Sequence, residues 1–261
     1  MILKSTITIP VLSGKTPRRL YVYLPPEYRK SSRSYPVLYM FDGHNVFFDR
    51  DATYGKSWGM SQYLKKENPA LIVVAVECNH KGNRRLCEYS PWSFEDERFG
   101  SVDSVGDVYM NWLVHELKPM IDSKYRTRPD RESTYICGSS MGGLMTVYAL
   151  TQWNHIFSRG AALSPSLWCH PQKMLELIEH TDFDPETILY MDYGSEELDN
   201  HPGMLPILTD VMEAFLQNGV CTCMRVVPGG QHTEASWEKQ IPIFMRCLGL
   251  NPRPHRPAKK R

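Results

Sequence analysis

The feature that most constrains the fold of this chain is a serine held between two glycines, where a strand gives way to a helix. A short apolar run, Tyr135-Ile-Cys137, has strand-like composition, and the sequence then resumes with a helical period that places Leu144 and Val147 on one side. Between them lies Gly138-Ser-Ser-Met-Gly142, a Gly-x-Ser-x-Gly pattern. Glycines two residues before and after the serine let the backbones pass closely in so tight a turn. The pattern therefore predicts that Ser140 projects its hydroxyl at the end of a sheet, as a nucleophile, instead of lying in an ordinary glycine-rich turn.

Strand and helix candidates alternate along the rest of the chain. Apolar runs predict strands at residues 2–9, 19–24, 36–43, 71–77, 159–163, 187–194 and 221–227, with the first two as edge strands. Helical periodicity marks residues 58–67, 104–124, 171–180, 202–218 and 233–248. In the second of these helices the apolar side is expected to carry Val105, Val108, Trp112, Leu113, Leu117 and Ile121. The alternation predicts an α/β fold with a mainly parallel central sheet and helices on both faces.

The chain shows no internal repeat and no dividing linker. Residues 1–250 are therefore expected to form one domain. Residues 251–261 are basic and rich in proline, which predicts a flexible tail. The long, polar and aromatic segment at residues 78–106 is expected to cross one edge of the sheet and to form one wall of a pocket.

Composition narrows the function classes. Lys and Arg number 30 and Asp and Glu number 29, so no strong field attracts nucleic acid or a membrane surface. The amino terminus lacks an apolar run of signal-peptide length, and no stretch approaches the length of a membrane span. The seven cysteines are scattered through core-like segments, which favours reduced thiols in a cytoplasmic protein. Cys221 and Cys223 have no second pair, and the acidic run from Asp42 to Asp51 lacks calcium-loop spacing, so we expect no metal and no cofactor.

The functional loops of a parallel sheet follow the carboxyl ends of its strands. Four stretches occupy such positions: Asp42-Gly-His-Asn45, Ser139-Ser-Met141, Gly194-Ser-Glu-Glu-Leu-Asp199 and Gly229-Gly-Gln-His-Thr233. They supply a serine, carboxylates and a histidine in the chain order that α/β-hydrolases have. The sequence therefore predicts that residues far apart in the chain meet at one rim of the sheet.

Each residue type in these stretches suits one part of an acyl transfer. An imidazole must take the proton of a serine hydroxyl before that hydroxyl can attack, and His232 is positioned to do so for Ser140. A carboxylate orients the imidazole, and spacing alone leaves Glu196, Glu197 and Asp199 as candidates. Backbone amides must stabilise the oxyanion, and the predicted donors are Met141 N–H, at the helix start, and His44 N–H, after the Asp42-Gly43 strand.

Several longer motifs resemble a known family. They are Leu38-Tyr-Met-Phe-Asp-Gly-His-Asn-Val-Phe47, Tyr54-Gly-Lys-Ser-Trp58, Arg84-Arg-Leu-Cys-Glu-Tyr-Ser-Pro-Trp92, Gly138-Ser-Ser-Met-Gly-Gly143 and Gly229-Gly-Gln-His232. Together they resemble the serine esterase family of the α/β-hydrolase superfamily, over residues 5–248. Its relatives include esterase D, the enterochelin (siderophore) esterases, feruloyl and acetyl-xylan esterases, and the mycolyltransferases. The resemblance implies the α/β-hydrolase fold.

The resemblance also selects among the open alternatives. The family's acid usually stands three residues after a glycine at the end of a strand, which implies Glu197 in Gly194-Ser-Glu-Glu197, with Asp199 in reserve. The family's second oxyanion amide follows the glycine of Asp-Gly, which agrees with His44. No cofactor is implied.

Three further residues are candidates for substrate binding. Arg85 is suited to bidentate contact with an anionic or hydroxyl-rich group, although an internal salt bridge that involves Glu88 and Tyr89 is the preferred interpretation. Trp58 and Trp92 could stack on a sugar or an aromatic acid, and packing of a loop is an equally good interpretation of each.

These residues and the resemblance predict a serine carboxylic-ester hydrolase that works through an acyl-enzyme on Ser140. The expected partner is a small-molecule ester of short-chain, acetyl or feruloyl type, from a saccharide or a siderophore, without nucleic acid or membrane. Two alternatives stay open: an acyltransferase that uses the same residues, and a catalytically silent module that binds a glycan or siderophore. A homo-oligomer is compatible with the sequence.

Overall fold

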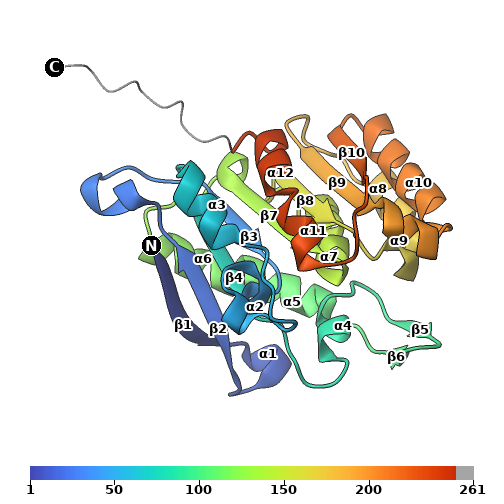
Figure 1. The fold of residues 1–261 in the computed structure, drawn as a ribbon, viewed down its shortest axis with the longest axis horizontal. Coiled ribbons are helices and arrows are strands. Elements are labelled where there is room, and N and C mark those ends of the chain that lie inside the picture. The colour runs from blue at the N-terminus through green and yellow to red at the C-terminus, as the bar shows by residue number, and fades with distance from the viewer. Residues whose placement is uncertain (251–261) are drawn as a thin grey trace.

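The computed structural model describes residues 1–250, and the predicted basic tail lies outside the described residues. Eight strands form one sheet, in the order β1-β2-β4-β3-β7-β8-β9-β10 (Figure 1). In chain order the strands are β1 Ile2–Thr8, β2 Pro17–Tyr23, β3 Val37–Met40, β4 Ile72–Val76, β7 Thr134–Ser139, β8 Arg159–Leu163, β9 Ile188–Gly194 and β10 Cys221–Val227. A separate pair, β5 Phe94–Asp96 and β6 Gly100–Val102, forms a short antiparallel sheet.

Six neighbouring strands of the sheet pair in parallel, in the order β4-β3-β7-β8-β9-β10. Strand β2 runs antiparallel to both β1 and β4. The predicted α/β-hydrolase fold, with a mainly parallel sheet, is therefore confirmed. The prediction that both amino-terminal strands are edge strands is half wrong. β1 does lie at an edge, but β2 has a hydrogen-bonded neighbour on each side, and its buried residues from Leu20 to Tyr23 fit that interior place.

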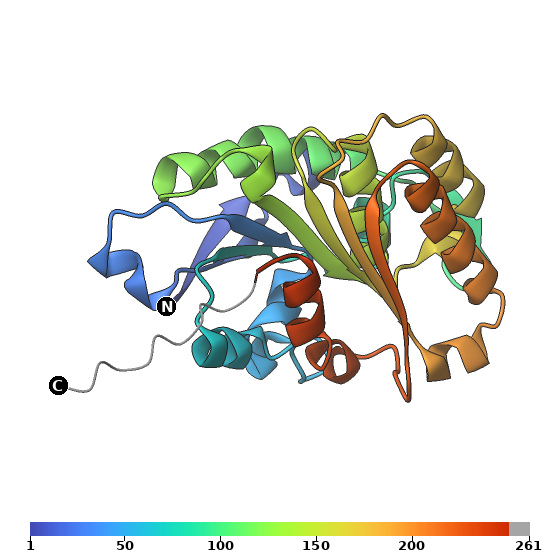
Figure 2. The ribbon, with the colours of Figure 1, turned by 90° about the horizontal axis from the view of Figure 1, so that it is seen from above.

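Helices cover both faces of the sheet, as Figure 2 shows from above. They are α1 Pro10–Ser13, α2 Gly43–Val46, α3 Met60–Glu67, α4 Arg84–Glu88, α5 Gly106–Trp112, α6 Lys118–Lys124, α7 Met141–Gln152, α8 Pro171–Glu179, α9 Ser195–Asn200, α10 Met204–Gln217, α11 Glu234–Glu238 and α12 Ile241–Cys247. Within the described residues no helix has the length and apolar character needed to cross a membrane.

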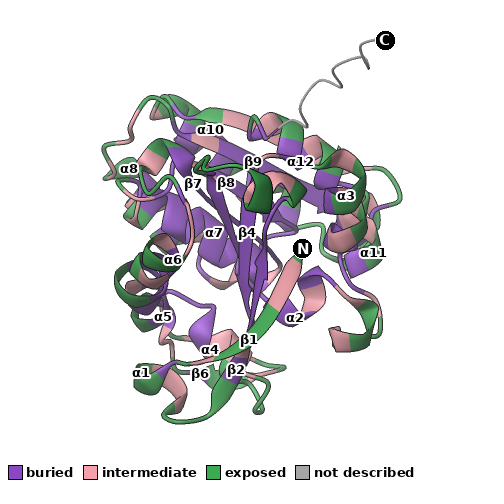
Figure 3. Ribbon diagram, turned by 90° about the vertical axis from the view of Figure 1, so that its left-hand side faces the viewer, coloured by how far each residue is buried: buried purple, intermediate pink, exposed green. Residues whose placement is uncertain are grey.

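The central strands are buried on both faces (Figure 3), which explains their continuous apolar sequence. Alternate residues enter two cores. Tyr39 and Ile136 pack with helices α5, α7, α8 and α10, whereas Leu38 and Tyr135 pack with α3, α11 and α12. Because side chains alternate along a strand, one short apolar run serves both layers.

The helix predicted at residues 104–124 is present, but one of its predicted apolar positions is wrong. Val108 is 39% exposed, and Tyr109 and Met110 are buried in its place. A π-helical turn at Leu113–Leu117 joins α5 to α6. Such a turn holds an extra residue, so the segment before it is rotated relative to the segment after it. A regular helical period cannot capture that shift.

The segment at residues 78–106 is held in place by a buried ion pair. Arg18 on β2 donates two hydrogen bonds, of 2.7 and 2.5 Å, to the carboxylate of Glu88 at the end of α4. The side chains are only 4% and 2% exposed. Farther along the segment, Ser90 Oγ lies 2.8 Å from Nε2 of His170, which precedes α8.

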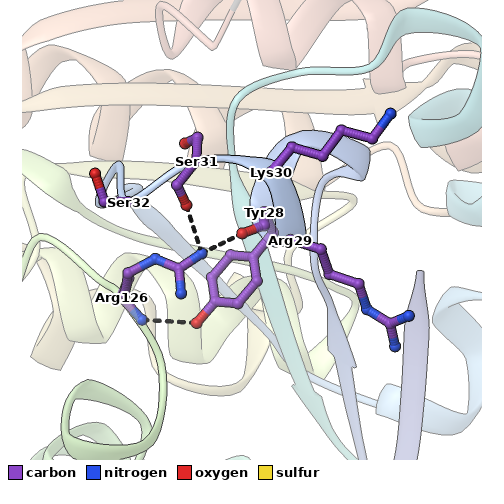
Figure 4. Close-up of a pocket in the computed structure, with 6 residues that line it drawn as sticks. All are labelled: Tyr28, Arg29, Lys30, Ser31, Ser32 and Arg126. Carbon is purple, nitrogen blue, oxygen red and sulfur yellow. Dashed lines mark hydrogen bonds between the residues drawn. The ribbon is translucent and has the colours of Figure 1, made fainter.

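A hollow of about 480 Å³ lies at the rim where the parallel strands begin, beside the amino end of β3. Figure 4 shows how Arg126 organises it: its guanidinium lies over the Tyr28 ring and donates hydrogen bonds to the carbonyls of Tyr28 and Ser31. The backbone N–H of Arg126 also donates to the Tyr28 hydroxyl. The cation is thus used to hold the loop before β3 in place.

We predict that Glu88→Ala lowers the free energy of unfolding by about 3–5 kcal/mol, because it leaves the Arg18 charge buried and unpaired. The matched control is Glu67→Ala, since Glu67 pairs with Lys66, whose side chain is 82% exposed, and such a pair contributes about 0–1 kcal/mol. Urea denaturation of both variants checks this. Equal losses of stability would show that burial of the Arg18–Glu88 pair has no energetic consequence.

Burial lowers the pKa of His170 to about 4, helped by the nearby Lys173. An unfolded histidine has a pKa of about 6.5, so between these values the unfolded chain binds a proton that the folded chain does not. Stability must therefore fall as pH falls through this window, by up to about 1.4 kcal/mol per pH unit for one proton.

We predict that His170→Gln makes the dependence of unfolding free energy on pH shallower between about pH 6.5 and 4. The comparison must be made against wild type, because burial also lowers the pKa of His44 to about 4 and raises that of Asp192 to about 7. Denaturant melts at several pH values give both slopes. Identical slopes in the two proteins would refute the burial of a neutral His170.

Candidate active site

Ser140 stands at the sharp junction between β7 and α7. Its φ is positive, with φ 58° and ψ −124°, a strained conformation that a residue with a side chain adopts only where the surroundings enforce it. Its N–H donates to the carbonyl of Leu163 on β8, and its carbonyl accepts from the N–H groups of Leu144 and Ser166. Three backbone bonds thus hold the strained residue in the tight strand-to-helix turn that the sequence predicted.

The glycine before the serine is required by close packing. A β-carbon on Gly138 would lie 2.6 Å from the backbone of Gly142 and 2.9 Å from the Phe41 ring. No side chain fits there without moving the backbone. The start of α7 therefore packs directly against the end of β7.

His232 and Glu197 are in direct contact. His232 lies in the loop between β10 and α11, and its Nδ1 is 2.6 Å from Oε2 of Glu197, at the start of α9. The Glu197 side chain is 5% exposed and that of His232 is 46% exposed. The contact uses Nδ1, so Nε2 is the ring nitrogen left to exchange a proton with another group.

The other oxygen of Glu197 is fixed by two donors. Oε1 accepts from the Ser164 hydroxyl, at 2.7 Å, and from the backbone N–H of Gly194, at 3.1 Å. Ser164 in turn accepts from Nε1 of Trp237, at 2.9 Å, and the Trp237 ring packs edge-on against His232 with centroids 5.1 Å apart. This closed arrangement limits the rotation of both the carboxylate and the imidazole.

The other carboxylates of the same loop do not occupy this position. Glu196 is exposed, and its Oε2 bonds the side-chain amide of Gln231. Asp199 is exposed on α9. Of the three candidates, Glu197 is the one that the structure places against His232.

The loops that carry Glu197 and His232 meet because two glycines face each other. A β-carbon on Gly194 would lie 2.2 Å from the carbonyl oxygen of Gly230. That carbonyl accepts the N–H of Glu196 at 3.1 Å, which joins the two loops. The neighbouring parallel strands β9 and β10 thus deliver acid and imidazole to the same place.

Ser140, Met141, Glu197 and His232 all line one cleft of about 980 Å³. The predicted wall from residues 78–106 is present, and it contributes Arg85, Leu86, Arg98 and Phe99 among others. The wall across the cleft comes from α9 and α10 and includes His201, Met204 and Ile207. The cleft is large enough for a ligand of several rings.

The two predicted oxyanion donors lie on the helices that follow β7 and β3. Met141 begins α7 and lines the cleft. His44 is the second residue of the short helix α2, so its N–H has no partner inside that helix. The His44 ring is buried and its Nε2 is 3.0 Å from the Thr53 hydroxyl.

Arg85 forms an internal ion pair, with a partner that the sequence did not suggest. It donates two 2.8 Å hydrogen bonds to the carboxylate of Asp42. Burial alone would raise the pKa of Asp42, but the charge and hydrogen bonds of Arg85, with smaller contributions from His44 and Cys78, together hold that pKa below its usual value. Arg85 keeps 30% of its side chain exposed in the cleft wall, whereas Glu88 pairs with Arg18, and the Tyr89 hydroxyl accepts the N–H of Asp42.

The two tryptophans predicted to bind substrate are not part of the cleft lining in the described structure. Trp58 is 3% exposed and packs against Trp237 and Phe244. Trp92 is half-buried and packs edge-on against Tyr148 and His170. Loop and core packing, the other interpretation of each tryptophan, accounts for these contacts.

Sequence reasoning missed Ser164 and Ser166. Ser164 follows β8 directly and Ser166 comes two residues later, at the same rim of the sheet as the predicted stretches. Ser164 has φ 44° and bonds Glu197, and the hydroxyl of Ser166 lies 3.5 Å from that of Ser140. The signal was available, since Ser-Pro-Ser ends a predicted strand.

Comparisons with known proteins agree with this architecture. The uncharacterised protein YbbA of Bacillus subtilis (strain 168) is 25% identical over 236 residues, which cover 86% of this chain and 89% of YbbA. An IroE-like serine hydrolase from Shewanella oneidensis superposes with a TM-score of 0.70 at 20% identity, covering 95% of this chain and 79% of that one. A ferulic acid esterase gives 0.67 at 19% identity, with coverage of 96% and 98%. At these identities the two superpositions establish the fold.

The model of one protein family, described as "Putative esterase", matches residues 13–245. That span includes the Ser140 turn, the Glu197 loop and the His232 loop. The chain therefore belongs to this family and is an esterase.

Proposed function

We propose that this esterase hydrolyses its substrate through an acyl-enzyme on Ser140, with His232 as general acid and base and Glu197 as the group that orients His232. The observation that carries the proposal is the 2.6 Å contact between His232 Nδ1 and Glu197 Oε2, in the same cleft that Ser140 lines. A carboxylate on Nδ1 leaves Nε2 to take the serine proton.

In the proposed reaction His232 Nε2 removes the proton of the Ser140 hydroxyl as Oγ attacks the ester carbonyl. Negative charge develops on the carbonyl oxygen, and the N–H groups of Met141 and His44 stabilise it. The imidazolium then gives its proton to the leaving alcohol. Water, deprotonated by the same ring, attacks the acyl-enzyme. The bond between the acyl carbon and Ser140 Oγ then breaks, the imidazolium returns the proton to Oγ, and the acid leaves.

The cleft wall supports an aromatic or short acyl group as substrate. Arg98 lies over the rings of Phe99 and Trp168, at 5.1 and 5.0 Å, and all three residues line the cleft. Such a surface suits a planar ring that carries polar groups. Structural neighbours include a ferulic acid esterase and an IroE-like serine hydrolase. We therefore place acetyl, short-chain and feruloyl-type esters, of saccharides or siderophores, first among the substrates to test.

Ser140→Ala should lower kcat for p-nitrophenyl acetate by about 10⁴-fold or more, because the nucleophile is lost while the oxyanion donors remain. Ser123→Ala is a suitable control, since its hydroxyl bonds the carbonyl of Met120 on the surface helix α6. Turnover of the Ser140→Ala variant at the wild-type rate would eliminate the acyl-enzyme proposal.

Glu197→Gln should lower kcat/KM by about 10³–10⁴-fold, because a neutral amide can neither orient the imidazole in the required tautomer nor stabilise its charged form. Asp199→Asn, a matched change of an exposed carboxylate on the same helix, should leave kcat/KM within about twofold of wild type. Steady-state kinetics of the two variants separates the candidates. A large loss in Asp199→Asn with none in Glu197→Gln would reassign the acid.

A further inference from the structure

Three side chains with metal-binding groups converge beside the catalytic rim. Three potential ligand atoms lie within 4.8 Å of one another: a ring nitrogen of His44, a ring nitrogen of His80 and the sulfur of Cys78. His44 and Cys78 are 2% and 3% exposed, whereas His80 faces solvent. His44 is carried by α2, after β3, and the other two follow β4, the parallel neighbour of β3. Sequence reasoning predicted no metal and did not consider these three residues together, since His44 is far from Cys78 and His80 in the chain.

The hydrogen bonds of the two rings leave the same nitrogen available in each. His80 Nε2 lies 2.9 Å from Oε1 of Glu77, and because a carboxylate only accepts, Nε2 carries the hydrogen and Nδ1 the lone pair. In the same way, His44 Nε2 lies 3.0 Å from the Thr53 hydroxyl, which can accept its hydrogen. Both rings can therefore present a bare Nδ1.

The Nδ1 of His44 has no hydrogen-bond partner within the described structure, although it is buried. A buried polar atom without a partner is rare in proteins, because its desolvation is uncompensated. A ligand that binds this lone pair would remove the deficit. The neighbouring Cys78 thiol and His80 imidazole are groups that bind metal ions, so a metal ion is the ligand that fits all three.

We propose that His44, Cys78 and His80 form a binding site for a zinc ion. Two imidazole nitrogens and one thiolate are a ligand set that Zn²⁺ accepts, with a water molecule as the fourth ligand. Mg²⁺ and Ca²⁺ prefer oxygen ligands and are disfavoured here. On binding, the Cys78 thiol releases its proton to solvent and its sulfur forms a bond to the metal.

The surroundings supply the support that such a site needs. A metal-binding histidine usually donates its second N–H to a carboxylate or another oxygen, which fixes the orientation of the ring. Glu77 fills this role for His80, and Glu77 is itself held by the backbone N–H and the guanidinium of Arg19. Thr53 fills it for His44.

Zinc at this site would join α2 to the segment that follows β4. The ring of His44 would bind the ion, while its backbone N–H stays with the rim that carries Ser140. The proposed acyl transfer assigns no step to this metal. The zinc proposal does not depend on the proposed reaction, and binding is measured without ester.

The test is titration of the full, metal-free chain with Co²⁺, a spectroscopic substitute for Zn²⁺. Wild type should bind one equivalent and show the near-ultraviolet thiolate-to-cobalt charge-transfer band, which Zn²⁺ then abolishes by displacing Co²⁺. Cys78→Ser should lose the band, while Cys221→Ser, a change of an exposed cysteine, should keep it. Zn²⁺ should also raise the Tm of wild type.

His80→Ala provides a second arm, because His80 is exposed and its loss does not open the core. This substitution should weaken Co²⁺ and Zn²⁺ binding by at least about 10–100-fold. A loss of that size is typical when a residue that only hydrogen-bonds to a metal ligand is removed, and His80 is itself a proposed ligand. His155→Ala, which removes another exposed histidine, should bind as wild type does. The proposal is wrong if wild type shows no charge-transfer band, or if the band and the affinity are unchanged in folded Cys78→Ser and in His80→Ala.

Discussion

The candidate site depends on backbones that approach more closely than a side chain allows. At the turn before Ser140, a β-carbon on Gly138 would lie 2.6 Å from Gly142, and between the acid and histidine loops, Gly194 meets the carbonyl of Gly230. The first approach lets the chain turn sharply at Ser140, whose φ is 58°, into helix α7. The second places Glu197 within reach of His232. Because the strands concerned run parallel, both junctions open at the same rim of the sheet.

A buried carboxylate must be supplied with hydrogen-bond donors, and the buried acids Glu197 and Asp192 differ in how they are supplied. Glu197 accepts hydrogen bonds from Ser164, from the N–H of Gly194 and from His232. Asp192, on the same strand as Gly194, accepts the Tyr190 hydroxyl at 2.6 Å, and burial raises its pKa to about 7. The donors thus gather around the carboxylate that faces the imidazole. Trp237, which bonds Ser164 and packs on His232, links that arrangement to the core below it.

Much of the fold could be predicted from the sequence, because buried parallel strands read as continuous apolar runs and the helices between them keep their period. The predictions that failed depend on features that no local sequence pattern contains. Val108 is exposed in the segment before the π-helical turn at Leu113–Leu117, and β2 gains a second neighbour only when the whole sheet is assembled. The predicted strand ends located Ser140, Glu197 and His232, but the choice of Glu197 over Asp199 came from a family resemblance. Partners of Arg85 could not be predicted, since Asp42 is more than forty residues away in the chain.

The central claim is that Ser140, His232 and Glu197 act as one unit at the rim of the sheet. A crystal structure of the protein after reaction with a fluorophosphonate tests it most directly. The account predicts a phosphonyl group bonded to Ser140 Oγ, its free oxygen within hydrogen-bond distance of the N–H groups of Met141 and His44, and the Nδ1 of His232 still on Glu197. A phosphonyl group on another residue, or an oxygen directed away from both amides, would contradict it.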